Sequence, residues 1–151
     1  MVEKYCDGVV PRGAATDLDR ADAADLAEYH SALDGSRGYL LHEGLKRVMA
    51  CAARGNEFVQ SQQPWALAKN PESRGELERV LAAIVRQLAR HAIHLAPFMP
   101  NKAQELWTQI GGPGRVEDQR FDGTDSLDAT GWRVSKGPSL FPKPADASVS
   151  R

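Results

Sequence analysis

The sequence lacks the features of a membrane or secreted protein. No apolar run approaches the roughly 20 residues that a transmembrane helix needs, and the N-terminal stretch MVEKYCDGVVPR has no apolar core of a signal peptide. The two cysteines, Cys6 and Cys51, form no CxxC or paired Cys/His spacing, so a zinc site is not indicated and both thiols are expected to stay reduced. These absences favour a cytoplasmic protein without a membrane partner.

The motifs of common enzymatic chemistry are absent as well. There is no GxSxG, no HExxH and no kinase set, and the GGPG stretch at 111–114 follows a predicted helix where a phosphate-binding loop would open one. His91 and His94 are three residues apart, a spacing that can serve metals, but no third ligand stands at a matching distance. We therefore predict no catalytic site, no metal and no cofactor in this chain.

The net charge of −1 hides an uneven distribution. Residues 1–36 carry three Lys or Arg against eight Asp or Glu, which gives −5, whereas residues 37–102 carry ten against five, which gives +5. A basic middle would attract an anionic partner, and a solvated helical surface explains the same charge without one. Charge alone leaves both interpretations open.

Apolar spacing and cap residues predict four helices in the region up to residue 112. Thr16 fits the N-cap of the first helix, which is expected to stop at Asp34 with its acidic face in solvent. The second helix runs over about 41–63, because Pro64 disfavours helical conformation in the residue before it. Its predicted core stripe alternates spacings of four and three: Leu41, Leu45, Val48, Ala52, Gly55 and Val59.

The third helix is expected over about 73–96 and a shorter fourth helix over about 100–110. Three arginines of the third helix, Arg79, Arg86 and Arg90, fall on an arc roughly opposite its apolar residues. They would face either solvent or the phosphates of an anionic partner. The core stripe predicted for this helix comprises Leu77, Leu81, Ile84, Leu88, His91 and Leu95.

From Arg115 onward the chain is rich in Gly, Asp, Ser and Pro, with apolar islands at 132–134 and 140–142. This composition predicts extended segments strapped across the helices, with no second domain. We therefore expect one helical domain over residues 1–143 and a disordered tail over 144–151.

One segment suits RNA better than the rest of the chain. Asn56 and Gln60 belong to an amide-rich helix end, which runs into the Pro64-Trp65 pair, with Lys69 one turn further on. Proline fixes the backbone, so the indole of Trp65 would be held in one orientation, where an unstacked base can stack on its face. The alternative is that Trp65 anchors the loop in the core, as most tryptophans do.

Several stretches, in this order, resemble the C-terminal domain of methionyl-tRNA synthetase. They are KYCDGVVP at 4–11, NEFVQSQQPWALAK at 56–69, LAPFMP at 95–100, and the tail LFPK at 140–143 that follows Trp132. The combination covers nearly the whole chain. The resemblance implies an all-α helical bundle of the class I aminoacyl-tRNA synthetase anticodon-binding type, with an extended C-terminal strap.

In that family the domain packs against a catalytic half and reads the CAU anticodon. The resemblance therefore implies an RNA-binding module whose partners are the anticodon stem-loop of tRNA(Met) and the catalytic domain of its own enzyme. The family's tryptophan stacks on the first anticodon base, which implies that role for Trp65 with Pro64 as a rigid hinge. Asn56 matches the family's asparagine in the same helix. The predicted RNA-binding residues are Trp65, Pro64, Asn56, Gln60, Lys69, Arg86 and Arg90.

The same resemblance places several parts of the enzyme upstream of Met1. These are an asparagine and an arginine four residues apart that read the anticodon, the ATP-binding motifs and a zinc knuckle. We therefore expect a monomeric module that catalyses nothing by itself, with ATP used only by the parent ligase. The missing asparagine and arginine leave a second hypothesis open, which is a structural or protein-interaction unit that no longer binds RNA.

Overall fold

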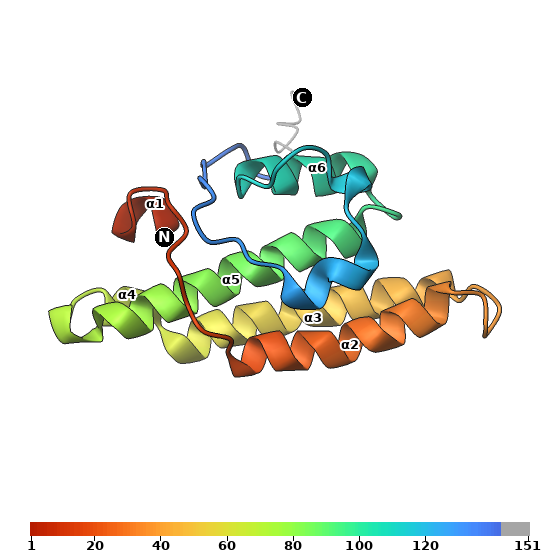
Figure 1. Cartoon of the computed structure of the whole chain (residues 1–151), viewed down its shortest axis with the longest axis horizontal. Helices are drawn as coiled ribbons and strands as arrows, with labels where there is room; N and C mark the ends of the chain where they lie inside the picture. Colours follow the sequence, from red (N-terminus) through yellow and green to blue (C-terminus); the bar gives the residue numbers. More distant parts are fainter. Residues whose placement is uncertain (143–151) are drawn as a thin grey trace, which may run out of the picture.

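The computed structural model describes residues 1–142, and within them all regular structure is helical (Figure 1). Four helices form the bundle: α2 (Asp17–Leu33), α3 (Leu41–Gln62), α5 (Arg74–Leu95) and α6 (Pro100–Gln109). Single turns lie beside them: α1 (Val2–Tyr5), α4 (Pro64–Leu67), η1 (Pro71–Ser73), η2 (Val116–Asp118) and η3 (Phe121–Ser126), although η3 is somewhat longer. The all-α prediction is confirmed. The predicted domain limit at 143 and the predicted tail over 144–151 lie outside the described residues.

Helix α5 is the central element of the bundle (Figure 1). The antiparallel hairpin of α2 and α3 packs along one side of α5, and α6 packs on the other side. The C-terminal strap pairs with the N-terminal segment, where Val10 N–H donates to Trp132 O at 2.9 Å and Val134 N–H donates to Gly8 O at 2.8 Å. The predicted C-terminal strap is confirmed, although its first part is not extended, because η2 and η3 form turns of helix there.

The ends of the four long helices lie within one or two residues of the ends predicted from cap residues and prolines. The N-cap of α2 is Thr16, whose backbone N–H and hydroxyl both donate to Asp19 Oδ2, at 2.7 and 2.9 Å. Helix α3 ends at Gln62, because Pro64 follows closely, and Pro100 opens α6 as a first-turn proline. The segment from Pro64 to Pro71, for which the sequence predicts a short loop, contains helical turns, since α4 forms there and η1 begins at Pro71.

Two glycines on α3 allow close approach of neighbouring helices. A Cβ at Gly44 would lie 3.1 Å from the Leu33 side chain of α2. A Cβ at Gly55 would overlap the side-chain oxygen of Gln87 on α5. The predicted stripe of α3 is right at Val48 and Gly55, which are buried, and wrong at Leu41, which is 61% exposed.

The predicted stripe of α5 is also right only in part. Leu77, Leu81 and Leu95 are buried, whereas Ile84, Leu88 and His91 are half-buried. The reason is that α5 meets α2 and α3 on one side and α6 on another, so burial extends around most of its circumference. No single stripe separates the inside of such a helix from its outside.

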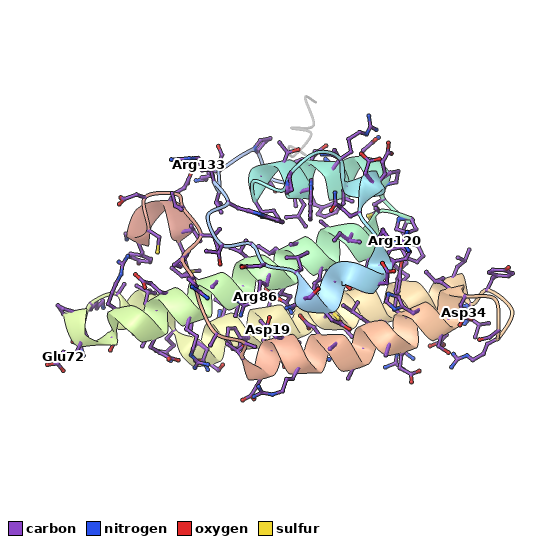
Figure 2. All side chains as sticks on the ribbon, viewed as in Figure 1. Asp19, Asp34, Glu72, Arg86, Arg120 and Arg133 are labelled. Carbon is purple, nitrogen blue, oxygen red and sulfur yellow. The ribbon has the colours of Figure 1, made fainter. Side chains whose placement is uncertain are left out.

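The outward placement predicted for Arg86 and Arg90 is wrong. Arg86 is 8% exposed and Arg90 is 4% exposed, and both side chains point toward α2. The Nη2 atom of Arg86 lies 2.8 Å from Asp19 Oδ2, and the Nη1 atom of Arg90 lies 3.3 Å from Asp22 Oδ2. Arg90 also pairs with Asp19. Figure 2 shows Arg86 and Asp19 together where α2 faces α5.

This network explains why the acidic face of α2 is not the solvent face that the sequence predicts. Asp19 and Asp22 are spaced three apart and meet arginines spaced four apart on α5, so matched charges are buried together. Burial by itself would raise the pKa of Asp19, but hydrogen bonds from Arg86, Arg90 and Thr16 hold that pKa well below its usual range. The carboxylate therefore stays charged inside the bundle.

Candidate functional site

The predicted Pro64-Trp65 pair lies at the corner between α3 and α4. A single residue, Gln63, joins the two helices, with φ 45° and ψ 60° in the left-handed region. Its N–H donates to Val59 O at 3.1 Å and so closes α3. Its carbonyl accepts hydrogen bonds from Ala66 N–H at 2.7 Å and Leu67 N–H at 3.2 Å, which starts α4. The sequence predicts that the helix ends at about Gln63, because Pro64 follows it, but it does not predict the left-handed backbone of this residue.

The corner buries Pro64 and presents Trp65 to solvent. Pro64 is among the fully buried side chains, whereas 39% of Trp65 is exposed. Trp65 is not a member of the hydrophobic core, whereas Leu67 packs against that core. Trp107 is the core tryptophan, 1% exposed, with its indole N–H donating to Pro113 O at 3.1 Å. The predicted exposure of Trp65 is confirmed, and the core-anchor alternative is wrong.

Three of the predicted RNA-binding residues are polar and exposed around the C-terminal end of α3 and the short helix that follows it. Asn56 and Gln60 lie one turn apart on α3, and Lys69 lies just after α4. Their side chains form no hydrogen bond or ion pair with any residue in the described range 1–142. Their amide groups and the ammonium group are therefore available to a ligand.

Asn56 also borders an open apolar groove of about 440 Å³ between α3, α5 and α6. Ile84 and Leu88 are half-buried and form part of its wall. His91 lies there too, with its buried Nδ1 atom lacking a hydrogen-bond partner. Burial lowers the pKa of His91, so the ring is neutral near pH 7.

The arginine arc predicted on α5 does not form an anion-binding surface. Arg86 and Arg90 belong to the buried network, and Arg79 is paired with Glu76 at 2.6 Å.

The corner between α3 and α4 combines the exposed indole of Trp65, the amides of Asn56 and Gln60, and the ammonium group of Lys69. Such a combination can stack on a planar ring and donate hydrogen bonds to its edge.

Residues 1–142 include no cluster of three metal-ligating side chains and no helix long and apolar enough to cross a membrane. No family model matches the sequence.

Known proteins resemble this chain along nearly its whole length. A methionine–tRNA ligase of Pyrococcus horikoshii is 32% identical over 99% of this chain, which is 20% of that protein. A methionine–tRNA ligase of Caldanaerobacter subterraneus is 29% identical over 95% of this chain and 23% of its own length. The chain therefore spans about a fifth of the length of the curated relatives that it matches.

The fold is also similar to a solved structure. The apo form of Mycobacterium tuberculosis methionyl-tRNA synthetase matches 94% of this chain with a TM-score of 0.76 and 23% sequence identity. The matched region is 29% of that chain. At this identity the likeness establishes the fold of the bundle.

Proposed function

Because this chain is homologous to a segment of the methionine–tRNA ligases over nearly its whole length, we propose that it is an anticodon-binding domain of such a ligase. Its ligand would be the anticodon stem-loop of tRNA(Met). The observation that carries the proposal is the exposure of Trp65 on a corner that buries Pro64. Methionine activation with ATP would depend on ligase segments beyond the matched fifth.

The physical case for RNA rests on how Trp65 is held. Its neighbour Pro64 is buried, and Leu67 packs against the core. Only one residue, Gln63, separates α3 from α4, the helix that carries Trp65. The indole therefore loses little freedom when a base stacks on it, and base–aromatic stacking contributes roughly 1–3 kcal/mol. Asn56 and Gln60 would supply donors and acceptors to base edges, and Lys69 would neutralise a phosphate.

A different function, as a protein-interaction unit, is favoured by one observation. The groove beside Ile84 and Leu88 leaves apolar surface open, and two of the predicted RNA-binding arginines are buried. The two functions differ in their response to salt. Phosphate contacts make the affinity for RNA fall steeply as salt is raised, whereas an apolar protein contact changes little.

The decisive experiment compares Trp65→Ala with Trp65→Phe and with Phe141→Ala. Phe141 is an exposed aromatic side chain, at 62%, that lies on the strap, where it lines the apolar groove and not the corner. Binding to a CAU anticodon stem-loop is titrated at low salt, and each variant is melted to check its fold. We expect Trp65→Ala to weaken binding about tenfold to a hundredfold, because one stacked base is lost.

Trp65→Phe should keep part of the affinity, and Phe141→Ala should bind as wild type. The melting temperature of Trp65→Ala should stay near that of wild type, because the indole lies outside the core. Full affinity in Trp65→Ala, or an equal loss in Phe141→Ala, would contradict the proposed contact.

A further inference from the structure

The residue that joins α3 to α4 adopts an uncommon backbone conformation. Only three residues other than glycine have positive φ among the described residues: Asp7, Tyr39 and Gln63. Left-handed conformation brings the Cβ of an L-residue close to the following carbonyl oxygen, so it persists only where the surroundings enforce it. At Gln63 the enforcement has two visible sources, which are the proline that follows and the hydrogen bonds on either side.

The first source is steric. The ring of Pro64 clashes with helical conformation at Gln63, so α3 cannot continue through this residue. The ordinary alternative before a proline is an extended backbone. An extended Gln63 would direct the chain away from α5, and the contact between α4 and α5 would be lost.

The second source is hydrogen bonding. In the left-handed conformation the N–H of Gln63 still reaches Val59 O, at 3.1 Å, while its carbonyl receives Ala66 N–H at 2.7 Å. One residue thus caps the end of α3 and begins α4. Because no other residue lies between the helices, the φ and ψ of Gln63 set the direction of α4.

That direction determines which side chains meet the core. Pro64 and Leu67 are three apart on one face of α4 and turn inward, and this leaves Trp65 on the outer face. The side chain of Gln63 is itself exposed and makes no hydrogen bond within residues 1–142. The backbone of Gln63 is therefore engaged and its side chain is not.

We propose that Gln63 is a positioning residue, whose left-handed backbone rather than its amide side chain aims the indole of Trp65 at an unstacked base. This inference rests on the proposed function of Trp65. It also separates Gln63 from Asn56 and Gln60, whose amides would contact the base directly.

The test uses substitutions that differ in how well they accept positive φ. Gly and Asn accept it, whereas the β-branched Val does not. Gln63→Gly, Gln63→Asn and Gln63→Val are compared for affinity to the CAU stem-loop and for the indole N–H resonance of Trp65. That resonance is identified by its absence in Trp65→Phe. The indole resonances of Trp107 and Trp132 report whether the core stays folded.

We expect Gln63→Val to shift the Trp65 resonance and to weaken binding about tenfold, since it forfeits one stacking contact. Gln63→Gly and Gln63→Asn should bind within about twofold of wild type and leave the resonance in place. A Val variant that matches wild type in both readouts would overturn the inference. A Gly variant as weak as Trp65→Ala would also overturn it, by assigning the contact to the amide.

Two further outcomes remain decisive. If Gln63→Val loses the Trp107 and Trp132 resonances, Pro64→Ala replaces it, because removing the ring lets Gln63 become helical and redirects α4. An unmoved Trp65 resonance and full affinity in Pro64→Ala would then refute the inference. If Trp65→Ala binds as wild type, the proposed function fails, while the Trp65 resonance in the Gln63 variants still decides whether that backbone aims the indole.

Discussion

Arg86 and Arg79 allow a direct comparison of a buried and an exposed arginine on one helix. The guanidinium of Arg86 binds Asp19 and two backbone carbonyls of the N-terminal segment, whereas Arg79 pairs only with Glu76 near the surface. Removing one partner of a buried ion pair costs roughly 3–5 kcal/mol, because the other charge stays buried. Since Arg90 still contacts Asp19, we expect Arg86→Gln to lose about 3 kcal/mol, near the lower limit.

Chemical denaturation followed by helical circular dichroism measures this loss. The slope against denaturant should stay the same, so that the shift in midpoint reports stability. For a chain of this size, about 3 kcal/mol corresponds to a fall in Tm of roughly 6–12 °C. Arg79→Gln is the matched control and should stay within about 0.5 kcal/mol of wild type, as surface substitutions usually do.

Equal and small losses in Arg86→Gln and Arg79→Gln would refute the buried network and restore the outward-facing arginine arc. The double variant Arg86→Gln with Asp19→Asn provides a second check. Because the two side chains share one network, its loss of stability should be smaller than the sum of the single losses. Additive losses would mean that the two groups do not interact.

Two further predictions concern pH and packing. Burial lowers the pKa of His94 from 6.5 to about 4, so between these values the unfolded chain binds a proton that the folded chain does not. The free energy of unfolding should therefore fall by about 3 kcal/mol as pH drops through this window. The variant His94→Gln keeps a hydrogen-bonding group beside His30, and its free energy of unfolding, measured by denaturation at each pH, should depend less on pH. The same pH dependence in wild type and His94→Gln would contradict the assignment of this effect to His94. Gly55→Ala should cost about 1–3 kcal/mol, because the new methyl group would overlap the Gln87 side chain. Gly75→Ala on α5 meets nothing within 4 Å and should stabilise by up to about 1 kcal/mol, so equal melting temperatures for the two variants would argue against the close packing.

The sequence by itself determined where the helices begin and end. Thr16 and Pro100 start helices, and Pro64 stops one, through contacts with residues a few positions away. Such signals act within a single turn, so no knowledge of the tertiary fold is needed to interpret them. The Pro64-Trp65 pair is also a local signal, because a proline after a helix end predicts a rigid turn of the chain wherever the helix lies in the fold.

Only the tertiary structure decided which faces of the helices are inside. Periodicity placed Arg86 and Arg90 opposite the apolar stripe of α5, and it could not show that α2 would bring Asp19 and Asp22 to meet them. It also could not show that α5 is covered from several sides and borders a groove beside Ile84. Burial depends on partners far away in sequence, and a charge can be buried when the neighbouring helix brings its counter-charge.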